Sequence, residues 1–245
     1  MPLLFNSSWL LVMVLAIAIG GLAQLGIRHA NKKYSRMPLA SGMTGAQVAL
    51  RILQSNGIAS PDGRTRRGSV GIQQVSGSLT DHYDPSTGIV SLSEGIYGGS
   101  SVAAAAVAAH EVGHAIQDAH GYVFGRLRTS MVPAVNFSSR FSMILILIGL
   151  FLGGASMIGG LAYYALWLGI ILYSLAVVFQ LVTLPVEIDA SRRGMAQLRS
   201  SGVLGPDELS GGRKVLTAAA MTYVAAALVS LLYLAFYIFM GSNRR

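Results

Sequence analysis

The residues best suited to chemistry in this sequence are two histidines and a glutamate at positions 110–114, which read His-Glu-Val-Gly-His. They lie in the segment Ser101–Asp118, whose alanine-rich composition predicts a helix. Two histidines four residues apart share one face of a helix, so both rings can bind a single metal ion. Glu111 lies between them and is placed to act on a water bound to that metal. The pattern predicts a zinc site for hydrolysis.

A catalytic zinc also needs a third protein ligand, and the composition limits the choice. The chain contains no cysteine, which excludes disulfides and cysteine-based zinc sites. The remaining candidates are His82, Asp118, His120, Glu187 and Asp189. We favour Glu187, because it follows Leu184-Pro185, where an apolar stretch ends and a helix over Val186–Ser200 can begin with a proline near its start.

The composition of the remaining chain is that of a membrane protein. Only 11% of the 245 residues are charged, against about 25% in soluble domains, and the mean hydropathy is +0.56. A bilayer is crossed by about 20 apolar residues in a helix, and four stretches qualify. They run over Trp9–Ile27, Ser142–Ile158, Leu161–Leu184 and Val215–Met240, and Gly159 and Gly160 predict a tight turn between the middle two.

The charge distribution predicts the orientation of these spans. Sixteen of the 18 Lys and Arg residues lie in 28–141 and 185–214, which four spans place on one side, and only Arg244 and Arg245 lie on the other. The positive-inside rule puts the first side in the cytoplasm and both termini outside. This topology brings Glu187 to the side of His110 and His114. The run Arg64–Arg67 is interpreted as a solvated loop near anionic headgroups, and nucleic-acid binding is a poor fit because basic residues are not interleaved with aromatic ones.

Short elements are expected between the first two spans. A helix capped by Thr44 should run to about Asn56, and Val70–Val75 should form a strand. Leu79–Pro85 and Ile89–Ser93 should form two strands joined by a turn at Asp84–Gly88. The strand made by Ile89, Val90, Ser91 and Leu92 is expected to offer a free edge to an extended substrate.

The fold class that follows is a mainly α-helical integral membrane protein with four transmembrane helices and a small cytoplasmic α+β catalytic unit of zincin type. The expected parts are an N-terminal transmembrane helix (1–27), a cytoplasmic catalytic part (28–141) with the zinc helix at 101–119, a transmembrane hairpin (142–184), a cytoplasmic helix carrying the third ligand (185–214), and a C-terminal transmembrane helix with its tail (215–245).

Three motifs together resemble the YugP-type bacterial membrane zinc metallopeptidases. They are the segment from His110 to Asp118, the segment from Leu79 to Pro85, and Pro185-Val186-Glu187-Ile188-Asp189-Ala190-Ser191-Arg192-Arg193. The resemblance covers nearly the whole chain. It implies one zinc ion on His110, His114 and Glu187, a catalytic Glu111, and a location in the bacterial inner membrane.

A more distant resemblance, to the HtpX-like and CAAX-type membrane proteases, differs in one respect. In those families an Asp usually follows the glutamate ligand by four residues and supports the first histidine, whereas here that position is Ser191 and the nearest acid is Asp189. Metal-bound histidines usually donate their second N–H to a carboxylate or a carbonyl. Asp118 and Asp189 are both candidates for this role, and the sequence does not choose between them.

The expected reaction is peptide-bond hydrolysis in membrane or membrane-proximal proteins, with Glu111 as general base and acid, as in metalloendopeptidases of the HExxH + Glu (gluzincin) type. Oxyanion-stabilising candidates are His82, Tyr83, Arg192 and Arg193. The partners are a protein or peptide substrate and the lipid bilayer; a homo-oligomer is compatible with the sequence, which does not indicate one. One alternative is a non-catalytic zinc-stabilised scaffold or adaptor, which would not need Glu111. The other is a small transporter, which should carry charged residues inside the spans, where none is found.

Overall fold

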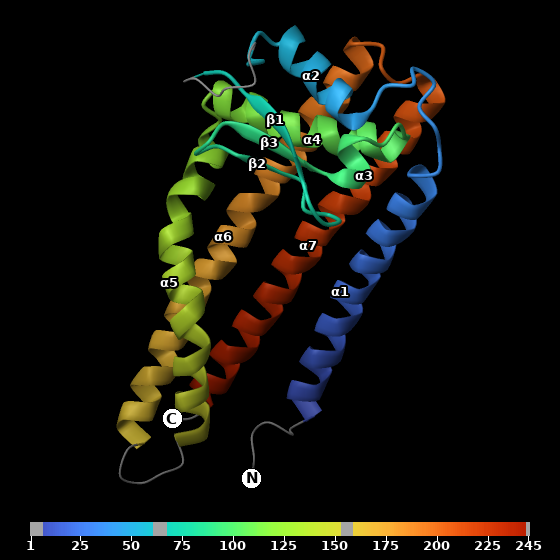
Figure 1. The fold of residues 1–245 in the computed structure, drawn as a ribbon. Coiled ribbons are helices and arrows are strands. Elements are labelled where there is room, and N and C mark those ends of the chain that lie inside the picture. Colours follow the sequence, from blue (N-terminus) through green and yellow to red (C-terminus); the bar gives the residue numbers. More distant parts are fainter. Residues whose placement is uncertain (1–6, 61–67, 153–158, 244–245) are drawn as a thin grey trace. The chain divides into compact units, whose positions relative to one another are not determined.

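The computed structural model describes residues 7–60, 68–152 and 159–243. The run Arg64–Arg67 lies outside them. The described chain is mostly helical (Figure 1). Its elements are α1 (Ser7–Tyr34), α2 (Gly45–Ser55), β1 (Gly71–Val75), β2 (His82–Asp84), β3 (Ile89–Ser93), α3 (Glu94–Tyr97), α4 (Val102–Ala119), α5 (Val123–Leu152), α6 (Gly159–Ser200) and α7 (Pro206–Ser242).

Four of the described helices are long and apolar enough to cross a membrane: α1, α5, α6 and α7. α1, α6 and α7 are each longer than the span predicted within them, and α5 contains the described part (142–152) of the second predicted span. α5 begins at Val123 and not near Ser142, with Pro133 inside it. Gly159 and Gly160 belong to the first turn of α6 and do not form the predicted turn, and residues 153–158 lie outside the described chain.

The largest difference from the sequence prediction is the continuity of α6 at Pro185. We expected a new helix to start there, but α6 is one helix of 42 residues with Pro185 in its interior. A proline removes only one backbone hydrogen bond of a helix, and long membrane helices tolerate this loss where their packing supports them. Glu187 therefore lies in the interior of α6 and not in the first turn of a new helix.

The described chain divides into two compact units, and each long helix contributes to both. The first unit comprises 1–23, 127–184 and 223–245. In it α5 and α6 approach closely, since a Cβ added at Gly149 would overlap Leu166 and one added at Gly169 would lie 2.8 Å from the Ile146 nitrogen. Ile146, Leu166 and Ile170 form its buried core with residues of α7.

The second unit comprises 24–126 and 185–222 and contains the sheet. Its strand order is β1-β3-β2, with β1 parallel and β2 antiparallel to β3. The β2–β3 turn is as predicted: the Asp84 carboxylate accepts hydrogen bonds from the Ser86 nitrogen (2.9 Å) and hydroxyl (2.7 Å), and Gly88 has a φ of 68°. The predicted free edge on β3 is wrong, because β1 and β2 occupy both of its sides (Figure 1). The outer strands of this sheet are β1 and β2.

Helix α4 begins and ends at identifiable signals. The Ser101 hydroxyl accepts a hydrogen bond from the Ala104 nitrogen (3.2 Å), which caps the first turn. At the other end the Gly121 and Tyr122 nitrogens donate to the carbonyls of Asp118 and Gln117, with Gly121 at a φ of 62°. This is the hydrogen-bond pattern of a Schellman motif. The two signals fix the ends of the helix that carries His110 and His114.

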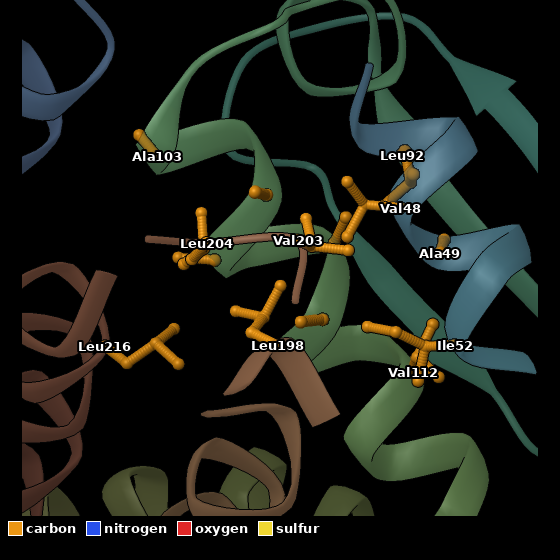
Figure 2. Close-up of a cluster of buried hydrophobic side chains, with 14 of the residues drawn as sticks. Val48, Ala49, Ile52, Leu92, Ala103, Val112, Leu198, Val203, Leu204 and Leu216 are labelled. Atoms are coloured by element: carbon orange, nitrogen blue, oxygen red, sulfur yellow. The ribbon is translucent and has the colours of Figure 1, made fainter. Parts of the chain in front are cut away.

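The core of the second unit joins α4 to elements from distant parts of the sequence (Figure 2). Val48 and Ile52 of α2, Leu92 of β3, Val112 of α4 and Leu198 of α6 are all fully buried. Burying each such side chain contributes about 1.5–3 kcal/mol. Val112 lies on the face of α4 opposite His110 and His114, and its packing in the core therefore fixes the position of the face that carries the two histidines.

Helices α4 and α6 touch backbone to backbone at two glycines. A Cβ added at Gly113 would overlap the carbonyl oxygen of Ala190, and one added at Gly194 would lie 2.6 Å from the carbonyl oxygen of Ala109. Only glycine permits such an approach of two helix backbones. This contact sets how closely α6 lies to the face of α4 that bears the histidines.

We predict that Gly113→Ala and Gly194→Ala each destabilise the protein by about 1–3 kcal/mol, because the added methyl group forces the two helices apart. Thermal unfolding in detergent measures the effect. Gly95→Ala is the matched control, since a Cβ added there has nothing within 4 Å. Equal unfolding temperatures for Gly113→Ala and Gly95→Ala would contradict the packing argument.

Candidate metal centre

Three side chains from α4 and α6 meet at one point. Glu187 Oε2 lies 3.3 Å from His110 Nε2 and 3.5 Å from His114 Nε2. The two imidazole rings are edge to face, with centroids 4.7 Å apart. Among the described residues, these are the His, Asp and Glu side chains grouped closely enough to share a metal ion, with one potential ligand atom each and all three atoms within 4.8 Å.

The geometry fits zinc. Zn–N and Zn–O bonds are about 2.0–2.2 Å long, and in a tetrahedral site two ligand atoms are then about 3.4 Å apart. The two separations of 3.3 and 3.5 Å match this value. Two imidazoles and one carboxylate also form a donor set that catalytic zinc uses, with a fourth position left for water. This arrangement agrees with the ligand set expected from the sequence, and metal binding by it stays a prediction.

The surroundings of the three atoms are negative and largely dry. Glu187 and Glu111 are buried, with 2% and 8% of their surfaces exposed. Burial by itself lowers the pKa of His114, but hydrogen bonding and the charge of Glu187, together with the charge of Glu111, raise it overall. Two carboxylates next to two imidazoles create a site that attracts a cation. Glu111 thus supplies charge at the centre from the helical turn that also carries both histidines.

The second nitrogen of each histidine has a neutral partner. His110 Nδ1 lies 3.0 Å from the Ser191 hydroxyl, and His114 Nδ1 lies 3.1 Å from Gln117 Oε1. The structure thus gives the rings Ser191 and Gln117 as partners, in place of the two candidates, Asp118 and Asp189. Asp189 is one step removed, because its Oδ2 accepts a hydrogen bond from Gln117 Nε2 (2.9 Å).

Asp118 takes part in a different contact, with the strand β2. It is exposed and accepts a hydrogen bond of 2.8 Å from the Tyr83 hydroxyl. Burial, the hydrogen bond to Asp118 and the nearby negative charge raise the pKa of Tyr83, so this hydroxyl keeps its proton at neutral pH and donates it to Asp118. The contact holds β2 against the last turn of α4.

The other sequence candidates have the following positions. His82 is exposed, with Nδ1 2.8 Å from the Thr80 carbonyl oxygen, and His120 Nδ1 lies 2.8 Å from the Ile116 carbonyl oxygen. Arg193 Nε donates to Asp189, and its guanidinium lies 5.8 Å from the centre of the Tyr122 ring. Arg192 is exposed on α6. The role of His82, Tyr83, Arg192 or Arg193 in stabilising an oxyanion stays a prediction.

Sequence reasoning missed three residues of this centre: Gln117, Ser191 and Gly194. The position of each in the sequence could have indicated it. Gln117 is three residues after His114 and so faces the same side of α4, while Ser191 and Gly194 continue the helix of Glu187. Ser191 was noted only as a departure from the aspartate of related families, yet it occupies the same position and contacts the same histidine.

Comparison with known proteins identifies relatives over nearly the whole chain. The family model described as "Putative neutral zinc metallopeptidase" matches residues 9–242. A protein of Bacillus subtilis (strain 168) named "Putative membrane protease YugP" is 44% identical over 239 residues, which are 96% of this chain and 99% of the relative. No solved structure matches.

These matches confirm the resemblance that the three sequence motifs indicated. They cover the four long helices, the sheet and the histidine–glutamate cluster together, so the relationship concerns the whole architecture. Family membership implies zinc as the metal, in agreement with the donor set described above. The chain belongs to the family of zinc metallopeptidases described as "Putative neutral zinc metallopeptidase".

Proposed function

We propose that this protein is a zinc-dependent endopeptidase of the bacterial inner membrane that hydrolyses membrane or membrane-proximal proteins from the cytoplasmic side. The observation that carries the proposal is the convergence of His110, His114 and Glu187 on one point, with Glu111 on the same turn of α4. A scaffold would need the three ligands but would have no use for a buried Glu111, whose desolvation has a cost.

The chemistry divides between the metal and the chain. Zinc bound at these three atoms would act as a Lewis acid and would lower the pKa of a coordinated water towards about 7. Glu111 then has the two proton transfers to perform. With the metal bound, Glu111 would accept a proton from the water that attacks the peptide carbonyl carbon and would return a proton to the nitrogen as the C–N bond breaks. Its low exposure protects this proton exchange from bulk water.

An extended substrate can pair with a strand that has a free edge. Among the described strands, β2 is an outer strand that contacts α4, whereas β3 lies in the centre of the sheet. Through the Tyr83–Asp118 hydrogen bond, β2 is fixed one helical turn beyond His114. We therefore propose β2 as the strand along which the substrate backbone lies.

We predict that Glu111→Gln retains zinc and loses activity. The amide matches the size of the carboxylate but cannot accept the proton, and general acid–base catalysis is worth about 10²–10⁴-fold in rate. Cleavage of casein by the protein purified in detergent measures the rate, and metal analysis measures the zinc content. Full activity of this variant would reject the endopeptidase mechanism, while absence of activity in a zinc-loaded wild type would favour the scaffold.

We predict that Glu187→Ala weakens zinc binding by more than the roughly 10–100-fold that loss of an outer hydrogen bond to a ligand costs. The control is Glu208→Ala, which removes another buried glutamate of the same unit. The Glu208 carboxylate accepts hydrogen bonds from the Ala40 and Gly205 nitrogens, 2.7 Å each, and does not belong to the histidine cluster. Chelator competition gives both affinities. Undiminished affinity in Glu187→Ala would remove Glu187 from the ligand set.

We predict that the Asp84–Gly88 turn faces the cytoplasm and the C-terminus faces outside. The chain has no native cysteine, so a single introduced cysteine reports its own position. Ser86→Cys and Ser242→Cys replace exposed residues. In intact cells a membrane-impermeant maleimide should label the second and spare the first, and permeabilised cells should show labelling of both. The reverse pattern would place the metal centre outside the cytoplasm.

A further inference from the structure

The buried amide of Gln117 has no part in the mechanism above, yet it makes three contacts at the centre. Gln117 Nε2 donates to the Val186 carbonyl oxygen (2.8 Å) and to Asp189 Oδ2 (2.9 Å), and Gln117 Oε1 lies 3.1 Å from His114 Nδ1. Only 3% of the residue is exposed. One side chain therefore joins the second histidine of α4 to two residues of α6 that lie within two positions of Glu187.

These contacts determine which way the amide faces. The Val186 carbonyl and the Asp189 carboxylate can only accept hydrogen bonds, so the group that faces them must be the NH₂ group. The amide oxygen is then the atom that faces His114. Because this oxygen can only accept, the hydrogen of the bond must come from His114 Nδ1. The lone pair of the neutral ring is thereby left on Nε2, the nitrogen that points at Glu187.

Asp189, which accepts a hydrogen bond from the Gln117 amide, is itself fixed by further contacts. Asp189 also accepts a hydrogen bond from Arg193 Nε, and the Arg193 guanidinium packs over the Tyr122 ring at 5.8 Å. Tyr122 lies just beyond the end of α4, where its nitrogen donates to the Gln117 carbonyl. The acceptor that orients Gln117 is thus fixed by a cation and an aromatic ring.

His110 has no equivalent constraint from Ser191. A hydroxyl can donate or accept, so it is compatible with either neutral tautomer of the ring. The two candidate zinc ligands therefore differ: the partner of His114 selects one tautomer, and the partner of His110 selects neither.

We propose that Gln117 is a positioning residue that holds His114 in the tautomer with Nε2 free for the metal, and that it thereby raises the affinity of the centre for zinc. The inference rests on the proposed function in taking zinc as the metal. It does not depend on catalysis.

The test uses the full chain in detergent. Gln117→Ala should bind zinc about 10–100-fold more weakly in chelator competition, as loss of an outer partner of a metal-bound histidine does. It should also change the visible absorption of the cobalt(II)-substituted protein, which reports the geometry of the ligands. Gln117→Glu combined with Asp189→Asn keeps an acceptor for His114 and exchanges donor and acceptor between positions 117 and 189, but it removes the donor to the Val186 carbonyl oxygen. It should bind zinc more tightly than Gln117→Ala, because it keeps the acceptor that selects the tautomer of His114.

Gln197→Ala is the matched control for lost stability. Gln197 also joins two helices through its amide, exchanging hydrogen bonds of 3.1 and 3.3 Å with Asn56, and it does not contact the histidines. This variant should lose stability without losing zinc affinity. If Gln117→Ala fails to fold, the double variant decides the matter, since the proposal requires that it bind zinc.

The outcomes separate this inference from the proposed function. Wild-type zinc affinity and an unchanged cobalt spectrum in Gln117→Ala would overturn the role of Gln117, even if Glu111→Gln is inactive. Weak binding by Gln117→Ala in a protein that cleaves nothing would support the role and reject the peptidase. A wild type that binds no zinc would overturn both.

Discussion

The contact between the backbones of α4 and α6 at Gly113 and Gly194 is the constraint on which the candidate metal centre depends. His110 and His114 belong to α4, and Glu187 belongs to α6. Because their ligand atoms lie about 3.4 Å apart, the two helices must approach more closely than side chains between them usually permit. Gly113 is also one of the two residues between Glu111 and His114. The same pentapeptide thus supplies the chemistry and the close packing.

Continuity of α6 through Pro185 serves the same end. A ligand in the first turn of a new helix would move with the fraying of that turn, whereas Glu187 lies within a helix that extends well beyond it in both directions. The position of the carboxylate is therefore determined by the packing of α6 against α4. Functional groups on such elements are held more precisely than groups on loops.

The polar residues next to the Nδ1 atoms of the two imidazole rings are neutral, and the charged ones lie further from these atoms. Neutral Ser191 and Gln117 contact the rings, and the charged Asp189 and Arg193 lie further out, paired with each other. A buried carboxylate directly behind a ring would add a third negative charge, next to those of Glu187 and Glu111, and buried charges are costly unless paired. The neutral partners orient the rings without that cost.

Much of this protein could be predicted from local patterns. Short segments punctuated by proline and glycine predicted the strands and the turn at Asp84–Gly88, and the uninterrupted apolar stretches located the four long helices. The spacing of His110 and His114 gave two candidate ligands, because a helix repeats its faces over short distances. The bounds of the long helices were less accurate, because a helix continues past the end of its apolar stretch and through a proline where packing supports it.

The sequence by itself determined the chemical identity of the centre: which residues can bind a metal and which can move a proton. Only the tertiary structure decided which groups support them. Asp118 and Asp189 both looked suitable behind the histidines, yet Ser191 and Gln117 occupy those positions, and β3 proved to be the central strand of its sheet. The physical reason is that such choices depend on the relative rotation and separation of helices distant in sequence, which the packing of many side chains sets together.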